Sequence, residues 1–208
     1  WSRVDFFARQ HQTAVLLMET GPYHSNVVRA MEWWMNAEFF RIRTRQFADR
    51  VRLIEFSSIS APSRYDEPRF RLDLTIGSEI ALLGYDPHPP AGLATPASVL
   101  NVSTQWRALE DVRQDYIVGT YLMTPQGAIE IQDDSAPVGG FWPTSTWNEG
   151  ETIRHNVAFV LPSDLAPGHY EIWTLMYSPV DGSRLPVSDA TGTTIRDHVV
   201  LYSVEVTR

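Results

Sequence analysis

The hydrophobic and polar positions divide the chain into two parts with different patterns. Residues 13–20, TAVLLMET, form a continuous apolar run that ends in an acidic residue, which is typical of a buried strand. After a turn, apolar side chains recur at helical spacing from residue 25 or 26 to about residue 36. A second strand is predicted over 50–58, and helical or irregular structure around 39–47. The first 60 residues are therefore expected to form a small α/β segment of strand, helix and strand.

The remaining pattern is that of an all-β domain. Residues 57–69, SSISAPSRYDEPR, have the composition of a linker. From residue 65 to residue 208, short strands alternate with turns, which is typical of two antiparallel sheets packed face to face. We expect a mainly β fold, an antiparallel β-sandwich of jelly-roll or immunoglobulin-like type, preceded by the small α/β segment. The predicted strands or strand pairs cover residues 70–76, 79–87, 98–109, 115–134, 151–162, 168–187 and 198–207.

Composition and charge exclude several classes of function. The formal net charge is −8, which argues against nucleic-acid binding because that function needs a basic face. The chain has no cysteine, and arginine supplies every basic side chain, so thiolate, Schiff-base and P-loop chemistry are excluded. No apolar run approaches the ~18 residues of a membrane-spanning helix. The chain begins at Trp1 without a signal peptide, which is typical of a fragment or a processed product.

One uncharged segment, PVGGFWPTSTW at 137–147, combines three aromatic residues with two glycines and two prolines. The two glycines allow an unusual backbone path. Flat aromatic faces stack on the C–H face of a pyranose, and acidic or amide neighbours bind its hydroxyls. The alternatives are that one or both tryptophans cover the end of the sandwich core or that they contact a partner domain. The carbohydrate-binding hypothesis names Phe141, Trp142, Trp147, Asp134 and Asn148.

The predicted helix carries two adjacent tryptophans, Trp33 and Trp34. Trp34 falls on the apolar stripe, whereas Trp33 lies beside it. Trp33 is therefore the candidate for an exposed contact with a partner or with a membrane interface, where tryptophan is favoured. The alternative is that both side chains pack between the helix and the sandwich.

Catalytic and metal-binding signals are weak. The six histidines are scattered without metal-ligand spacing, so no metal site is predicted. The G-x-S-x-G motif is absent, and Ser25 beside His24 is interpreted as a helix cap. Glu19 and Glu32 are interpreted as solvated or ion-paired side chains. No cofactor is expected, with a structural calcium bound by loop carboxylates as the alternative; its candidate ligands are Asp73, Glu79, Asp86, Asp133 and Asp134.

Five segments, in this order, resemble a known family: IALLGYD, DYIVGTYLMTPQG, PVGGFWPTSTWNEGE, LPSDLAPGHYEIWTLMYSPVDGSRLPV and LYSVEV. They are similar to the C-terminal soluble domain of bacterial multi-spanning membrane glycosyltransferases of the protein mannosyltransferase and aminoarabinose transferase type, common in Chloroflexus-like bacteria. The resemblance covers about residues 50–208. In that family, acidic residues between membrane helices carry out catalysis, and none of those residues has a counterpart in this chain.

The resemblance implies a non-catalytic accessory domain of a glycosyltransferase-like membrane protein, on the extracytoplasmic face of a bacterial membrane. Such a domain would position a glycan or a lipid-linked sugar acceptor, or brace the membrane-embedded part of the parent protein. No catalytic residue is assigned to this chain, although the parent protein would be a glycosyltransferase. Two alternatives stay open: a hydrolytic enzyme with a cleft between the α/β segment and the sandwich, and a protein-interaction module with an exposed apolar patch.

Overall fold

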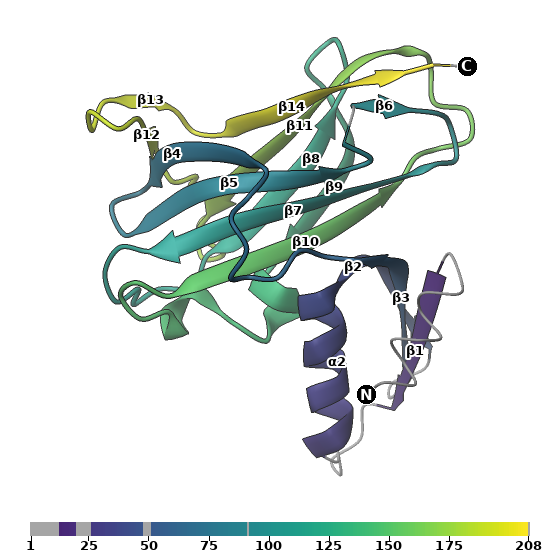
Figure 1. Cartoon of the computed structure of the whole chain (residues 1–208), viewed down its shortest axis with the longest axis horizontal. Helices are drawn as coiled ribbons and strands as arrows, with labels where there is room; N and C mark the ends of the chain where they lie inside the picture. The colour runs from purple at the N-terminus through teal and green to yellow at the C-terminus, as the bar shows by residue number, and fades with distance from the viewer. Residues whose placement is uncertain (1–12, 20–25, 48–50, 91, 208) are drawn as a thin grey trace.

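Two mainly antiparallel sheets pack face to face to form the body of the molecule (Figure 1). The computed structural model describes residues 13–19, 26–47, 51–90 and 92–207. The expectation of a mainly β fold, a sandwich preceded by a small segment that contains a helix, is confirmed. The larger sheet has the order β1 (Thr13–Glu19), β3 (Val51–Ser60), β2 (Phe39–Phe47), β10 (Thr152–Val160), β7 (Val99–Ala108), β5 (Ile80–His88), β4 (Phe70–Ile76), β12 (Val187–Ser188) and β13 (Thr194–Arg196). The smaller sheet has the order β6 (Leu93–Ala94), β14 (Val199–Val206), β11 (Gly168–Tyr177), β8 (Ile117–Met123) and β9 (Ile129–Ser135).

The main hydrophobic core lies between the two sheets. In β7 and β10, every second side chain points into it, as the period of a strand requires. Trp106 of β7 is fully buried there, and its indole N–H donates to the Thr104 hydroxyl at 2.8 Å. The sandwich is thus held mainly by apolar burial between the inner faces of its strands.

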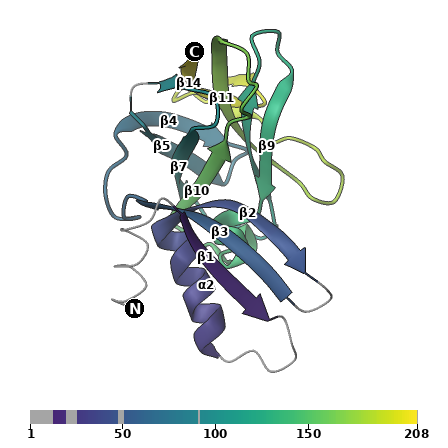
Figure 2. The same cartoon turned by 90° about the vertical axis from the view of Figure 1, so that its right-hand side faces the viewer.

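The first elements of the chain form a separate layer beside the sandwich (Figure 2). Helix α2 (Asn26–Glu38) packs against β2 and β3 through a second apolar cluster that contains Met35, Phe39, Ile54 and Phe56. The sequence-based expectation of helical or irregular structure at 39–47 was wrong, because these residues form β2 and pair with β3 along its length. The pairings β1–β3 and β2–β3 are antiparallel, so no parallel βαβ unit forms. A parallel bridge between Val157 of β10 and Arg41 of β2 joins β1, β3 and β2 to the other strands of the larger sheet.

The segment that the sequence presents as a linker is only partly one. Residues 57–60 belong to β3, and residues 61–69, which we call the strap, connect β3 to β4 over the outer face of the larger sheet. The first strap residue, Ala61, donates its amide to the Glu38 carbonyl at the end of α2, at 2.8 Å. Within the part of the chain that the structure describes, no helix has both the length and the apolar character needed to cross a membrane.

Candidate functional site

A cavity of about 230 Å³ lies where α2, the strap and the 137–142 loop meet. We call it the aromatic cavity, because three aromatic side chains from three segments, Trp33, Tyr65 and Trp142, line it. The polar groups at its wall come from the end of the helix, the strap and β10. They belong to Glu38, Ser63, Arg64 and Arg154.

The three aromatic side chains differ in exposure, and Arg64 contacts the rings of two of them. Tyr65 is 79% exposed and Trp33 is 41% exposed, whereas Trp142 is half-buried. The Arg64 guanidinium carbon lies 4.7 Å from the ring centre of Trp142 and 4.8 Å from that of Tyr65, and its Nη2 donates to the Tyr65 hydroxyl at 2.6 Å. Both distances are within the range of a cation–π contact. The wall of the cavity therefore combines flat apolar faces with a cation that has further N–H donors.

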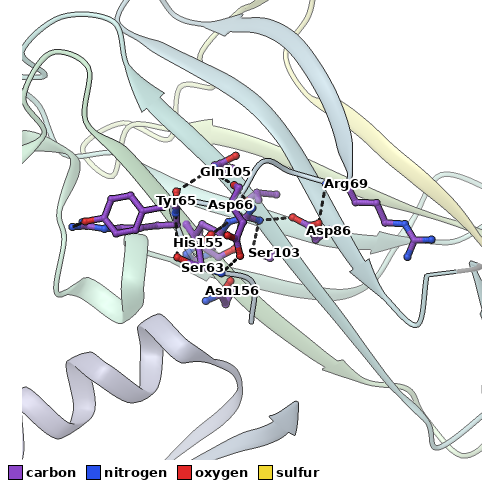
Figure 3. A network of polar contacts seen from close by, with 12 residues as sticks. Ser63, Tyr65, Asp66, Arg69, Asp86, Ser103, Gln105, His155 and Asn156 are labelled. Carbon is purple, nitrogen blue, oxygen red and sulfur yellow. Dashed lines mark hydrogen bonds and ion pairs between the residues drawn. The ribbon is translucent and has the colours of Figure 1, made fainter. Parts of the chain in front are cut away.

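The strap is fixed by side chains on the outer face of β7 and β10 (Figure 3). Arg154 of β10 donates from Nε to the Ser63 carbonyl at 3.0 Å and from Nη2 to the Asp66 carbonyl at 2.9 Å. Gln105 of β7 donates from Nε2 to the carbonyls of Arg64, at 2.9 Å, and Asp66, at 3.0 Å. Because these bonds reach backbone atoms on both sides of Tyr65, they set the positions of Arg64 and Tyr65 directly.

The charge of Arg154 is balanced inside the same network. Its side chain is 2% exposed, and its Nη1 forms an ion pair with Asp86 of β5 and donates to the Ser103 hydroxyl at 3.3 Å. The other carboxylate oxygen of Asp86 accepts the backbone amide of Arg69 at 2.9 Å. A buried guanidinium requires such compensation, and here the compensating groups are also the ones that hold the end of the strap.

The 137–142 loop is docked on α2 by close backbone approach. Pro137–Gly140 form a short 3₁₀ turn in which Val138 has φ of 55° and Gly139 has φ of 65°. A Cβ atom at Gly139 would collide with the side-chain amide of Asn36 on α2. Glycine is therefore required here both for its positive φ and for its missing side chain, which confirms the unusual backbone path expected from the sequence.

The structure separates the five residues of the carbohydrate-binding hypothesis. Trp142 lines the aromatic cavity, but Trp147 is 1% exposed and belongs to the sandwich core. The Trp147 indole N–H donates to the Trp142 backbone carbonyl at 3.0 Å, so this tryptophan supports the loop from within and does not reach a ligand. Phe141 packs against the core.

The two polar members of that hypothesis lie apart from the aromatic cavity. Asp134 sits on β9, where its carboxylate accepts the Tyr121 hydroxyl at 2.8 Å. That contact lies outside the inter-sheet core, because Tyr121 belongs to a separate cluster with Met123 and Leu175. Asn148 is exposed in a turn whose backbone bonds run to Glu151. The structure brings Trp33 to the cavity instead, and its side chain is 41% exposed there.

The polar residues of the cavity and Tyr65 were not anticipated from the sequence, among them Glu38 and Arg64. Arg64 and Tyr65 fall in the segment interpreted as a linker. The sequence held one indirect signal for this segment. Polar residues alternate along 98–109, which suggests a strand with one side facing solvent, but Asn101, Ser103 and Gln105 are all buried in the structure. A buried polar face needs hydrogen-bonding partners above it, and the strap supplies several of them.

A second polar group lies within the sandwich, near the edge formed by β9. His155 of β10 is 2% exposed, and its Nε2 is 3.5 Å from the Ser135 hydroxyl, which bonds to Asp133. Burial lowers the pKa of His155 to about 4. In a catalytic triad the carboxylate orients the histidine, whereas here it bonds to the serine and the His155 Nδ1 has no partner among the described residues. Because no described carboxylate bonds to His155, this arrangement does not have the carboxylate–histidine–serine sequence of hydrogen bonds that activates a serine.

In the described part of the chain, no three histidine or acidic side chains gather in a way that would hold a metal ion. Two of the carboxylates considered for calcium have other partners: Asp86 pairs with Arg154, and Asp133 lies 3.7 Å from Arg41.

No family model matches the chain, and no curated protein matches it either. Nineteen chains of known structure match. One is the C-terminal domain of wzt, with 13% identity over 68% of this chain and 82% of that chain, and a TM-score of 0.44. Another is a Niemann-Pick type C2 protein from the Japanese carpenter ant, with 12% identity over 68% and 98% of the two chains, and a TM-score of 0.35. A third is the CARDB domain of a Pyrococcus furiosus protein in complex with di-metal ions, with 12% identity over 72% and 100%, and a TM-score of 0.35. Likenesses this distant do not transfer a function.

Proposed function

We propose that this chain is a non-catalytic carbohydrate-binding module and that the aromatic cavity is its binding site. The observation that carries the proposal is that Trp33, Tyr65 and Trp142, from three distant segments, line one cavity. One or more aromatic faces beside a few polar groups form a surface that suits a pyranose ring, which has an apolar C–H face and polar hydroxyls at its edge.

Each polar group in the cavity has a role in this proposal. Arg64 stays against the Trp142 ring and donates its remaining N–H groups to sugar hydroxyls at the rim. The carboxylate of Glu38 accepts hydrogen bonds from hydroxyls on the side of the helix. The strap network fixes Arg64 and Tyr65 before a ligand arrives, which reduces the entropic cost of binding.

We propose a non-catalytic role because several carboxylates that could act in catalysis are paired with other side chains. Glu32 on α2 is paired with Arg52 at 3.0 Å, Asp86 with Arg154, and Asp133 bonds to Ser135. Each of these carboxylates therefore has a structural partner. A glycoside hydrolase needs two carboxyl groups on either side of one bond, and Glu38 is the acid among the residues lining the aromatic cavity.

The wider setting of the module comes from the resemblance of the five segments. We propose that the chain belongs to a membrane glycosyltransferase-like protein, where it faces the outside of a bacterial cell and presents a glycan or lipid-linked acceptor to the membrane-embedded part. In that setting, the binding site retains the acceptor and the catalytic residues lie elsewhere in the parent protein.

The test is saturation-transfer NMR on this chain with methyl glycosides of mannose, glucose and galactose, followed by titration of those that bind. We expect a dissociation constant on the order of 1 mM for one sugar ring. Trp142→Ala and Trp33→Ala should each weaken binding roughly 5–10-fold, because each removes a stacking face.

The matched control is Trp173→Ala. Trp173 is also partly buried, but it lies on β11, stacks on His198 at 3.9 Å and does not line the aromatic cavity. Its removal should leave sugar binding unchanged. Absence of saturation transfer to every glycoside, or equal losses in Trp142→Ala and Trp173→Ala, would refute the proposed site.

A further inference from the structure

We infer that the ligand is an uncharged oligosaccharide of about three or more units, which extends from the aromatic cavity into a second cavity on the other side of Tyr65. This inference rests on the proposed function and specifies its ligand. The second cavity, which we call the long cavity, has a volume of about 710 Å³. The two cavities share Arg64 and Tyr65 in their walls.

The two cavities lie over neighbouring residues on one face of the larger sheet. Arg154 lines the aromatic cavity and Gln105 lines the long cavity. These two residues are directly paired across β10 and β7. Side chains paired in this way on one face of an antiparallel sheet have Cβ atoms about 5 Å apart. Because both side chains are buried beneath the strap, a ligand that occupies both cavities passes over the strap at Tyr65.

The division between the cavities is formed by side chains of the strap. Tyr65 is 79% exposed, so its ring stands in solvent rather than packing against the sheet. The carbonyls of Arg64 and Asp66, on either side of it, are held by Gln105 and Arg154. A ring supported in this way at the junction of two cavities can stack on a sugar unit that spans them.

The charges of the long cavity select a neutral ligand. Its lining contains three basic side chains, Arg64, Arg71 and Arg107, and three acidic ones, Asp66, Glu67 and Glu151. Their formal charges cancel, and the chain as a whole carries −8, which repels a polyanion. Sugar hydroxyls both donate and accept, so they suit a wall in which guanidinium and carboxylate groups are mixed.

One of these groups has its hydrogen-bonding capacity left for a ligand. Arg107 is exposed and has no ion pair or side-chain hydrogen bond among the described residues. Leu72 and Leu83 add apolar wall.

The length of the ligand follows from the two volumes. The long cavity is about three times the size of the aromatic cavity, at 710 against 230 Å³. The aromatic cavity alone is below the ~300–1,000 Å³ that is usual for a small-molecule site, and the long cavity falls within that range. If one ring occupies the aromatic cavity, the long cavity accommodates at least two more.

The experiment measures affinity against chain length by isothermal titration. The probes are mannose, glucose and galactose with their linear oligomers from two to five units, together with oligogalacturonates of the same lengths. For the neutral series that binds, we expect affinity to rise roughly 10-fold or more between one and three units and then to level off. The oligogalacturonates should bind more weakly at every length.

Arg107→Ala isolates the long cavity. This variant should leave the affinity for the single sugar within about 2-fold and reduce the affinity for the trisaccharide about 5-fold or more. The matched control is Arg196→Ala, at an exposed arginine on β13 that lines neither cavity. It should change neither value.

The outcomes separate this inference from the proposed function. If single sugars bind in a Trp142-dependent way but affinity is independent of length, the long cavity is not part of the site and the inference fails alone. Preference for oligogalacturonates would overturn the neutral ligand. If no sugar of any length binds, both the inference and the proposed function are wrong.

Discussion

The two faces of β7 and β10 are both buried, but they are built from opposite kinds of side chain. The inner face is largely apolar, and the residues that pack there are Leu100, Val102, Trp106, Ile153, Val157 and Phe159. The outer face is largely polar, and the buried polar residues there are Asn101, Ser103, Gln105, Arg154 and Asn156. Apolar contact is non-directional and tolerates many arrangements, whereas hydrogen bonds fix the group they reach. The inner face therefore holds the sandwich together, and the outer face positions the strap and α2.

The outer face also contributes less to stability than the inner face, because some of its buried polar atoms lack hydrogen-bond partners in the described part of the chain. Both side-chain atoms of Asn101, together with the side-chain oxygens of Gln105 and Asn156, have no partner among the described residues. A buried polar atom without a partner costs free energy, so stability alone would favour apolar residues at these positions. Departures of this kind are expected where a surface serves a function, and here the strap above it carries Arg64 and Tyr65.

The largest effect is expected on the inner face, from Trp106→Ala. Removal of a fully buried indole leaves a void in the core and should lower the free energy of unfolding by about 4 kcal/mol. The measurement is denaturant unfolding followed by circular dichroism. The remaining folded molecules should retain the strap in place, with sugar affinity unchanged. A stability loss below about 1 kcal/mol would contradict the assignment of stability to this face.

A smaller stability effect with a different signature is expected on the outer face, from Arg154→Met. Loss of the guanidinium leaves Asp86 without its ion pair and the Ser63 carbonyl without its Arg154 donor, and it leaves the Asp66 carbonyl with Gln105 as its remaining donor. We expect a loss of about 3 kcal/mol, together with faster hydrogen exchange of strap amides such as that of Arg69.

Arg154→Met should also weaken sugar binding, because the strap is held less firmly, even though the aromatic rings of the cavity are unchanged. The control is Arg113→Met, at an arginine whose side chain is 80% exposed and paired with Asp111, where the change should stay within about 0.5 kcal/mol. If Arg154→Met lowered the free energy of unfolding without changing the hydrogen exchange of the strap amides, the proposal that the outer face positions the strap would be wrong.

The smallest expected effect concerns the one histidine buried on the inner face. Burial holds the pKa of His155 at about 4, below the 6.5 of the unfolded chain, so between these values the unfolded state binds a proton that the folded state does not. Stability should therefore fall as the pH is lowered through this window, by roughly 2 kcal/mol between pH 7 and pH 5.

His155→Leu should remove this part of the pH dependence, measured as the difference between variant and wild-type unfolding free energies at each pH. His169→Gln, at an exposed histidine on β11, is the control and should follow the wild type. A difference between His155→Leu and the wild type that does not vary between pH 7 and pH 5 would show that His155 titrates normally.

Sequence patterns predicted the β class, most of the strands after residue 70 and α2, because these depend on spacing between near neighbours. The prediction of helical or irregular structure at 39–47 failed. These residues form a strand that pairs with β3, and its arginines Arg43 and Arg45 are exposed to solvent. The sequence patterns also left open whether one or both of Trp142 and Trp147 cover the core. The turn at 144–146 sends Trp147 into the core and leaves Trp142 in the cavity.

The amino-acid sequence by itself determined that this chain folds into packed sheets, and it marked the aromatic loop as unusual. Only the tertiary structure decided that the strap lies over β7 and β10 and that three distant aromatic residues share a cavity. The bond from Arg154 to Ser63 spans 91 residues, and that from Asn156 to Ala37 spans 119. Periodicity reports which side of a strand a residue occupies, but it carries no information about which distant segment covers that side.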